Sequence, residues 1–470
     1  MRARSLTVAV LLPVLASARA HGQQAARPSR AELITRIDSL ANDYLRTAPA
    51  PSVAVAVVKG SDTIVMKAYG FANIEAKRPA TATTVYEIGS LTKQFTAAGI
   101  MKLVEAGKLS LDDEITKYVP TYPTPGGHRI TIRHLLTHTS GVHNYTSVAA
   151  WRSTWNSDIT TDSIVGFVRR DSLDFAPGTR YSYSNTGYVL LGMVIEKISG
   201  KSYAKFVQDE FFTPLKLTQS SYCPSKTTDP SFAAGYTRSG SQLVPATFLN
   251  LTHPHAAGAL CSTVKDFVAW QRALASGKVV SPASYTQMTT PNTLNDGRAT
   301  NYGFGLNSTM LSGHRNITHT GGINGFTTVA HYFPEDTLNV VAFDNTDHVS
   351  PGALASNIAR AFYGLPMVSR QPAAAQPLPA DRRDKFVGTY VLTQANRDSL
   401  VFKISVRGEG LVADIVGQSV VPLIYSGNDT FGIAADPSVR LTFIVEGDRA
   451  TRLRLVQGGE TIEGPRRPSP

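Results

Sequence analysis

Ser-x-x-Lys segments at Ser90–Lys93 and Ser262–Lys265 are the first candidates for chemistry in this 470-residue chain. Positions i and i+3 of a helix lie on one face, so each segment places a hydroxyl beside an amine. A serine hydroxyl is a weak nucleophile until a base takes its proton, and a lysine whose pKa is lowered by burial can be that base. Each pair is a candidate covalent centre, although so short a motif also arises by chance.

Three later segments give the first copy a context. Residues 131–141 read TIRHLLTHTSG, residues 175–188 read FAPGTRYSYSNTGY, and residues 319–326 read HTGGINGF. At these residues the chain resembles the serine β-lactamase and penicillin-binding protein superfamily, in the class C β-lactamase-related branch with its D-aminopeptidases and family VIII esterases. The resemblance covers residues 30 to 365, and its motifs follow the order Ser-x-x-Lys, Tyr-x-Asn, His-x-Gly.

The resemblance implies a role for each residue of the first two motifs. Ser90 is the expected nucleophile, and Lys93 and Tyr183 are expected to share the work of the general base. Tyr183 would act as a phenolate or a hydroxyl, and a phenol with a pKa near 10 needs a neighbouring cation such as Lys93 to act as a base at neutral pH. Asn185 offers both a donor and an acceptor, so it is expected to bridge Lys93 and a substrate amide.

The third motif carries the implied substrate-binding residues His319, Thr320 and Gly321, and the backbone N–H groups of Ser90 and Gly322 are the implied oxyanion hole. Most of the superfamily has Lys-Thr-Gly here, whereas this chain has His319. An imidazole with a pKa near 6.5 is charged about a quarter of the time at pH 7. We therefore expect a weak anchor for the carboxylate of a β-lactam, with carboxylate binding that rises below about pH 6.

Motif order also separates the candidates from their mimics. Ser262–Lys265 follows the Tyr-x-Asn segment, which is the wrong order for the superfamily. Glu335–Asn339 mimics the deacylation loop of class A β-lactamases, but it follows His319 and is interpreted as a turn between strands. His134 and His138 are four residues apart in a segment interpreted as packing a helix against a loop, and not as a metal site.

These motifs predict a serine hydrolase that acts through an acyl-serine intermediate on amide or ester carbonyls, such as β-lactams and D-amino-acid peptides. No metal or cofactor is expected, because the chain has no His-Glu-x-x-His spacing and its two cysteines cannot form a tetrahedral zinc site alone. Two alternatives stay open. One is a short-chain carboxylesterase with little β-lactam turnover, and the other is a non-catalytic penicillin-binding or sensing protein.

Hydrophobic periodicity indicates the elements that must position these residues. We expect an α/β (α+β) fold of the β-lactamase/transpeptidase type, in which an antiparallel sheet built from both chain ends is flanked by helices and an all-helical subdomain lies between. Helices are predicted over 32–45, from 90 to near 107, and over 184–199, 266–276 and 353–363. Strands are predicted over 53–58, 63–69, 326–333 and 338–343.

The last part of the chain differs in composition. A segment rich in Pro, Ala and Gln, residues 367–381, is interpreted as a linker between a hydrolase domain, 21–366, and a C-terminal domain, 382–470. Beyond it the helical signal disappears, and short β-rich runs predict a small all-β barrel-like domain. These runs cover 386–392, 400–406, 411–416, 420–424, 441–445 and 451–456.

The N-terminus predicts export. Residues 1–20 combine Arg2 and Arg4, an apolar core and a small-x-small end at Ala18–Ala20, as in a secretory signal peptide, so we expect a periplasmic or secreted protein. No later stretch reaches the roughly 18 apolar residues of a membrane span, and stable membrane insertion is not expected.

Export permits the two cysteines, Cys223 and Cys261, to form a disulfide, with two buried free thiols as the alternative. The formal charge is +11, but the basic residues are scattered, so we expect a small-molecule or peptide substrate and no nucleic acid. The sequence does not predict an oligomeric state.

Overall fold

The computed structural model describes residues 27–123, 125–169, 172–240, 242–367, 375–393, 400–415, 420–433, 436–457 and 460–467. The predicted signal peptide and residues 368–374 of the predicted linker lie outside these ranges.

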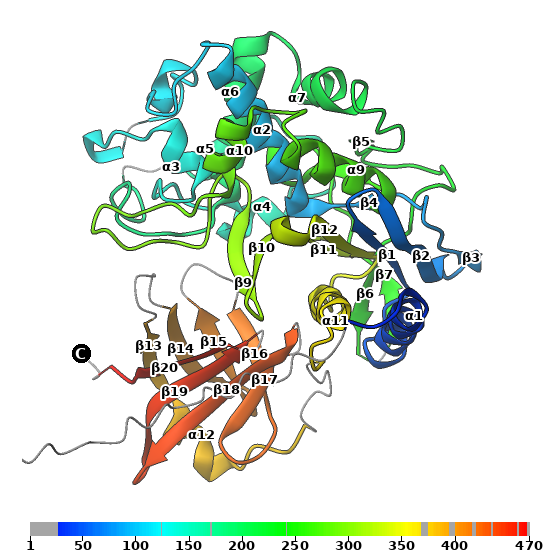
Figure 1. The fold of residues 1–470 in the computed structure, drawn as a ribbon. Coiled ribbons are helices and arrows are strands. Elements are labelled where there is room, and N and C mark those ends of the chain that lie inside the picture. Colours follow the sequence, from blue (N-terminus) through cyan, green and yellow to red (C-terminus); the bar gives the residue numbers. More distant parts are fainter. Residues whose placement is uncertain are drawn as a thin grey trace, which may run out of the picture.

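A seven-stranded antiparallel sheet joins the two ends of the larger part of the chain, as predicted (Figure 1). Its strand order is β3-β2-β1-β12-β11-β10-β9, and β1 pairs with β12 so that Val55 lies opposite Ala342. The strands are β1 Ser52–Lys59, β2 Asp62–Asn73, β3 Arg78–Pro79, β9 Asn307–Leu311, β10 His314–Ile323, β11 Phe326–Phe333 and β12 Leu338–Asp344.

One face of the sheet is covered by α1 (Arg30–Thr47) and α11 (Gly352–Phe362), which pack on alternate residues of β1 such as Val53 and Val55. The helix α1 begins with a capping box, because the Ser29 hydroxyl accepts from Glu32 N–H and the Glu32 carboxylate accepts from Ser29 N–H. Such reciprocal capping satisfies two donors that a helix N-terminus otherwise leaves unpaired, and the helix begins at Arg30, two residues before the predicted range of 32–45.

The other face of the sheet carries the helical block, which packs on the remaining residues of β1, including Ala54 and Ala56. Its α-helices are α2 Thr92–Glu105, α3 Ile132–Leu136, α4 Ala149–Arg152, α5 Thr161–Gly166, α6 Asn185–Ser199, α7 Tyr203–Val207, α8 His255–Gly258, α9 Val264–Ala275 and α10 Pro282–Thr289. Short helical turns are η1 Gly89–Leu91, η2 Ile115–Lys117, η3 Pro125–Gly127, η4 Tyr145–Ser147 and η5 Gln208–Phe212. The helix α6 ends at Gly200, whose φ of 70° is the left-handed conformation that closes helices.

Two small sheets stand beside the helical block. One has the order β4-β8-β5, from Tyr86–Glu87, Leu260–Ser262 and Ser221–Tyr222, and the other joins β6 (Tyr236–Ser239) to β7 (Gln242–Pro245). A disulfide joins Cys223, just after β5, to Cys261 in β8. The bond therefore ties the β5 side of the small sheet to its central strand β8, and β4, the strand that leads to η1, pairs with the other side of β8.

The C-terminal residues form an eight-stranded antiparallel sheet that is nearly closed into a barrel, as predicted. One bridge, from Tyr390 to Arg466, links the two end strands. The strands are β13 Gly388–Leu392, β14 Leu400–Arg407, β15 Gly410–Ile415, β16 Val420–Tyr425, β17 Thr430–Ile433, β18 Asp436–Glu446, β19 Arg449–Gln457 and β20 Glu460–Pro465.

The barrel corrects three predictions. The strands β17 and β20 were not predicted, and Phe386 ends a short helix, α12 (Arg383–Phe386), instead of opening a strand. The chain also makes a short turn, η7 (Ala380–Arg382), where no helical signal was expected. Phe386 packs against Phe431 and Phe443 inside the barrel, so this helix plugs the barrel with an apolar side chain.

The barrel adjoins the α11 side of the main sheet, since β18 contacts α11. The helix α2 lies on the opposite face of that sheet, with the helical block. Figure 1 shows the two parts as separate bodies with β9, β10 and α11 nearest the barrel. Within the described ranges, no helix has both the length and the apolarity needed to cross a membrane.

Candidate active site

Ser90 lies in the turn η1, directly before α2, where the chain approaches β10 very closely. Gly89 has a φ of 51°, and a Cβ at this position would lie 2.8 Å from the backbone nitrogen of Gly322. A Cβ at Gly321 would similarly lie 2.1 Å from the carbonyl oxygen of Ile88. Only glycine permits this approach, which brings the backbone of Gly322 next to the turn that carries Ser90.

Lys93 is fully buried in the first turn of α2, and its Nζ is surrounded by three oxygens. Nζ lies 3.1 Å from Ser90 Oγ, 2.8 Å from Asn185 Oδ1 and 2.8 Å from the carbonyl oxygen of Ala257. Burial lowers the pKa of Lys93 well below its usual value near 10.5, because the charged ammonium is poorly solvated there. A neutral amine has two N–H donors and one lone pair, which matches two carbonyl-type acceptors and one hydroxyl.

Tyr183 lies on the other side of the serine. Its hydroxyl makes a hydrogen bond with the Ser90 side chain, and Lys93 Nζ is 4.8 Å from the centre of its ring. Burial raises the pKa of the Tyr183 phenol above its usual value of 10, and the hydrogen bond with Ser90 only partly opposes this shift. Of the two forms considered from the sequence, the structure favours the neutral hydroxyl over the phenolate.

Asn185 is the first residue of α6, and two contacts hold it in place. Its backbone N–H donates to Oδ1 of Asn144 at 3.1 Å, and its side-chain Oδ1 accepts from Lys93. Because Lys93 Nζ donates to Oδ1 at 2.8 Å, the amide is oriented with Oδ1 toward the lysine. The helix thus delivers an acceptor to the buried amine, while the Nδ2 donor has no hydrogen-bond partner among the described residues.

His319 in β10 is buried, and both of its ring nitrogens have partners within the protein. Nδ1 lies 2.6 Å from the carbonyl oxygen of Thr320, so Nδ1 carries the proton, and Nε2 accepts from the Tyr302 hydroxyl at 2.9 Å. Burial, and secondarily the nearby Lys93, lower the pKa of His319 to about 3. The expectation of an imidazole charged a quarter of the time at pH 7 is therefore wrong, because it used the pKa of a solvated ring.

Thr320 and Gly321 follow His319 along β10. The side chain of Thr320 is exposed, while Gly321 is buried against the backbone of Ile88. The structure thus brings the residues of all three motifs into one site around the Ser90 hydroxyl.

Three contributors to this site were missed in the sequence. The carbonyl oxygen of Ala257, in α8, and the hydroxyl of Tyr302 belong to segments with no motif of their own. His138 was interpreted as packing, yet its ring lies 4.2 Å from the ring of Tyr183. The φ of 57° at His138 marks an unusual backbone position that no sequence pattern identifies.

His138 holds the segment that carries Tyr183. Its Nδ1 accepts from the backbone N–H of Ser184 at 3.1 Å, which places the ring proton on Nε2. Nε2 is buried and has no hydrogen-bond partner among the described residues. The neighbouring His134 instead completes a capping box with Thr131 at the start of α3, in agreement with the packing interpretation of that segment.

The mimics fall elsewhere. The Ser262 hydroxyl is buried against that of Ser220 at 2.9 Å, whereas Lys265 is exposed in α9. Glu335 lies in a short helical turn, η6 (Pro334–Asp336), between β11 and β12, as interpreted from the sequence. Among the described residues, no three His, Cys, Asp or Glu side chains gather in a way that could hold a metal ion.

A mixed α/β fold with a serine, a buried lysine and a tyrosine at the junction of sheet and helical block defines a serine hydrolase of the β-lactamase-related type. The chain belongs to the Beta-lactamase family, whose model matches residues 37–364.

Similar proteins agree with this class. Penicillin-binding protein 4* of Bacillus subtilis is 28% identical over 88% of this chain and 94% of its own length. A D-aminopeptidase of Gluconobacter oxydans is 29% identical over 68% of this chain and 60% of its own length. The solved structure of an octameric penicillin-binding protein homologue from Pyrococcus abyssi has a TM-score of 0.66, at 26% identity, and covers 92% of this chain and 99% of its own.

Proposed function

We propose that this protein is an exported hydrolase that cleaves amide or ester bonds of D-amino-acid substrates through an acyl-serine intermediate at Ser90. The observation that carries the proposal is the set of three contacts around Lys93 Nζ. Two of the contacts, with Asn185 and Ala257, use the N–H donors of a neutral amine. The third places Nζ 3.1 Å from Ser90 Oγ, within reach of the serine proton that the amine is proposed to accept.

Acylation begins with groups that already contact the Ser90 side chain, Lys93 and Tyr183. Ser90 Oγ attacks the substrate carbonyl carbon while its proton passes to Lys93 Nζ, and the carbonyl oxygen becomes an oxyanion. The backbone N–H groups of Ser90 and Gly322 are proposed to stabilise that oxyanion, and the Nδ2 donor of Asn185 to bind another carbonyl of the substrate. The proton next moves through the Tyr183 hydroxyl to the leaving amine or alkoxide, the carbon–nitrogen or carbon–oxygen bond breaks, and the acyl group stays on Ser90.

Deacylation reverses the proton path. A water molecule attacks the acyl carbon, and its proton passes to the Tyr183–Lys93 pair as the new bond forms. The bond to Ser90 Oγ then breaks, and the serine regains its proton. Tyr183 acts here as a neutral relay, which fits a phenol whose pKa is raised by burial.

His319 guides the choice of substrate class. Its Nδ1–H is donated to Thr320 and its Nε2 accepts from Tyr302, so this position lacks the positive charge that would pair with a substrate carboxylate. β-Lactams and peptides with a free C-terminal carboxylate beside the scissile bond are therefore proposed to be poor substrates. D-amino-acid peptides and amides, the class suggested by the similar D-aminopeptidase, need no such anchor.

The test is to incubate the protein with a D-amino-acid p-nitroanilide, a p-nitrophenyl ester and a fluorescent penicillin, and to locate the modified residue by peptide mapping. We expect anilide and ester turnover that Ser90→Ala abolishes. Ser262→Ala is the matched control, because it removes the serine of the Ser262–Lys265 segment, and it should leave labelling at Ser90 intact. Equal activity in Ser90→Ala protein would refute the proposal.

A further inference from the structure

A cavity of about 260 Å³ lies beside the small β4-β8-β5 sheet, and it is lined by Glu87 of β4 and Phe326 of β11. Both residues are neighbours of the proposed oxyanion hole along the chain. Glu87 precedes Ser90 by three residues, and Phe326 follows Gly322 by four. The two segments that meet at the nucleophile thus each contribute a residue to the wall of the cavity.

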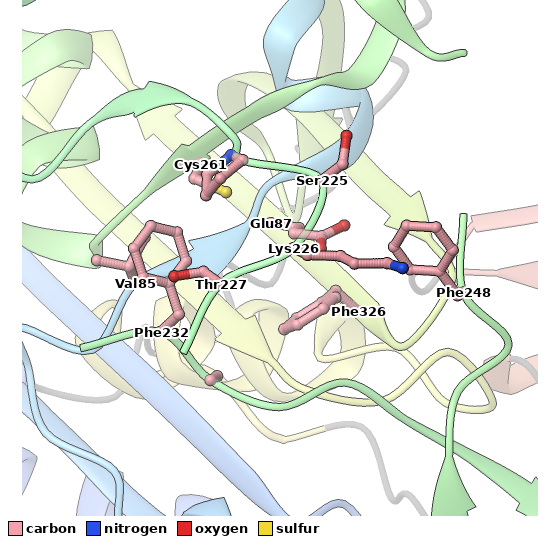
Figure 2. A pocket seen from close by; sticks show the side chains of 11 residues that line it. Val85, Glu87, Ser225, Lys226, Thr227, Phe232, Phe248, Cys261 and Phe326 are labelled. Carbon is pink, nitrogen blue, oxygen red and sulfur yellow. The ribbon is translucent and has the colours of Figure 1, made fainter. Parts of the chain in front are cut away.

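The cavity combines apolar walls with a carboxylate. Its apolar surface comes from Val85, Phe232, Phe248 and Phe326. Figure 2 shows the carboxyl group of Glu87 among these residues, with Lys226 extending away toward Phe248. This is the pattern of a site for a ligand with an apolar body and one polar group.

The carboxylate of Glu87 has no partner of its own among the described residues, and burial alone shifts its pKa, with no hydrogen bond or nearby charge contributing. Lys226 does not neutralise it, because no ion pair within 4.0 Å joins them and the Lys226 ammonium lies 5.1 Å from the centre of the Phe248 ring.

The hydroxyls that line the cavity are already used. Ser225 Oγ accepts from the backbone N–H of Leu251 at 3.2 Å, and Thr227 Oγ1 accepts from the backbone N–H of Asp229 at 3.0 Å. The carboxyl group of Glu87 is therefore the acceptor that a ligand would find in this cavity.

We infer that this cavity is the acyl-side subsite of the Ser90 centre and that Glu87 binds a protonated amine on the acyl group of the substrate. The inference rests on the proposed function and deepens it. An ammonium would give the Glu87 carboxylate a positive partner and hydrogen-bond donors. A buried charge is favourable only when an opposite charge or a hydrogen bond compensates it. A substrate with an apolar acyl side chain and a free amine fits, whereas a plain carboxylic ester leaves Glu87 unmatched.

The pH dependence follows from the same carboxyl group. Burial raises the pKa of Glu87 to about 8, so at pH 7 it is mostly protonated in the free protein. Lys226 is the other charged side chain among the residues that line the cavity, and the disulfide-bonded Cys261 does not titrate. Preference for an acyl group with a permanent positive charge should therefore rise as the pH increases through 8, whereas an α-amine, with a pKa of about 8, loses its own charge over the same range. A trimethylammonium acyl group keeps its charge at every pH and isolates this effect.

The experiment compares D-phenylalanine p-nitroanilide with 3-phenylpropionyl p-nitroanilide, which lacks only the amine. The unaltered protein should prefer the first, and Glu87→Gln should lower the ratio of the two kcat/KM values roughly ten- to hundredfold, as for loss of a hydrogen bond to a charged group. The kcat/KM for the amine-free compound should change little. Lys226→Met, the matched control, removes the opposite charge and should keep or increase the preference.

Calorimetry separates this inference from the proposed catalysis. D-phenylalaninamide and 3-phenylpropionamide are titrated into Ser90→Ala protein with and without Glu87→Gln. Tighter binding of the amine-bearing amide that disappears with Glu87→Gln supports the subsite even if no turnover is found. The same affinity for both amides, or an equal loss for both in the Glu87→Gln protein, would overturn it. Unchanged hydrolysis by Ser90→Ala protein would instead refute the proposed nucleophile.

Discussion

The Tyr302 hydroxyl donates a hydrogen bond to Nε2 of His319 at 2.9 Å, and this contact defines the proton state of the third motif. The imidazole carries one proton, on Nδ1, and this N–H donates a hydrogen bond to the carbonyl oxygen of Thr320. A histidine held in this way is an uncharged residue of the active site. Where a lysine would present a charge to the substrate, this chain presents none.

The first prediction concerns pH and substrate carboxylates. Because the pKa of His319 is lowered to about 3, its charge does not change between pH 5 and pH 8. The ratio of KM values for a carboxylate-bearing substrate and its methyl ester should therefore be flat over that range. Steady-state kinetics of the pair measures this ratio. Tighter carboxylate binding below about pH 6, lost in His319→Gln, would show that the imidazole is charged after all.

The second prediction concerns Lys93 as a base. Lys93→Met keeps the length of the side chain but removes the lone pair that faces Ser90, so acylation should slow by about a thousandfold. Stopped-flow labelling with a fluorescent ester measures the rate. In the unaltered protein the rate should increase with pH as the lysine loses its proton, and it should show no further rise near pH 10.5, because burial has lowered this pKa.

Arg at the same position is a useful control for the Lys93 prediction, since a guanidinium keeps a charge and cannot act as a base. Lys93→Arg should be as slow as Lys93→Met. Rapid acylation in either variant would assign the base to another group.

The third prediction concerns His138 as a positioning residue. His138→Asn suits a φ of 57°, because asparagine tolerates the left-handed region, but it removes the ring that packs on Tyr183 at 4.2 Å. We expect kcat to fall roughly ten- to hundredfold through misplacement of Tyr183, with little change in KM. When Tyr183→Phe is already present, adding His138→Asn should cause no further fall in kcat. Additive losses in the double variant would mean that the histidine acts separately from the tyrosine.

The fourth prediction concerns the disulfide between Cys223 and Cys261, which are 38 residues apart. By the chain-entropy model, a loop of this length stabilises the fold by about 4 kcal/mol. Replacing both cysteines with serine should lower the melting temperature of the hydrolase part in calorimetry. Because Cys261 pairs with Glu87 in β8 and β4, next to η1, activity should also become more sensitive to heat. An unchanged melting temperature would show that the bond adds no net stability.

Local patterns account for the parts of the fold that were predicted. The helix α1 begins at a capping box, α6 ends at a left-handed glycine, and β11 covers the residues 326–333 predicted from its apolar run. Each signal lies within a few neighbouring residues, so a sequence contains it in full. The strands β17 and β20 lack such a signal. They are short and contain Gly432 and Gly464, and their identity comes from pairing with β18 and β19.

The sequence by itself determined which functional groups this protein has: the order of the motifs selected Ser90 and Lys93 over Ser262 and Lys265. Only the tertiary structure decided the state of those groups. Burial lowers the pKa of Lys93 well below its usual value, and a residue with no motif, Tyr302, bonds to the buried ring of His319. The physical reason is that a pKa depends on solvation and on neighbours that folding brings together. The spacing of residues along the chain predicts neither of them.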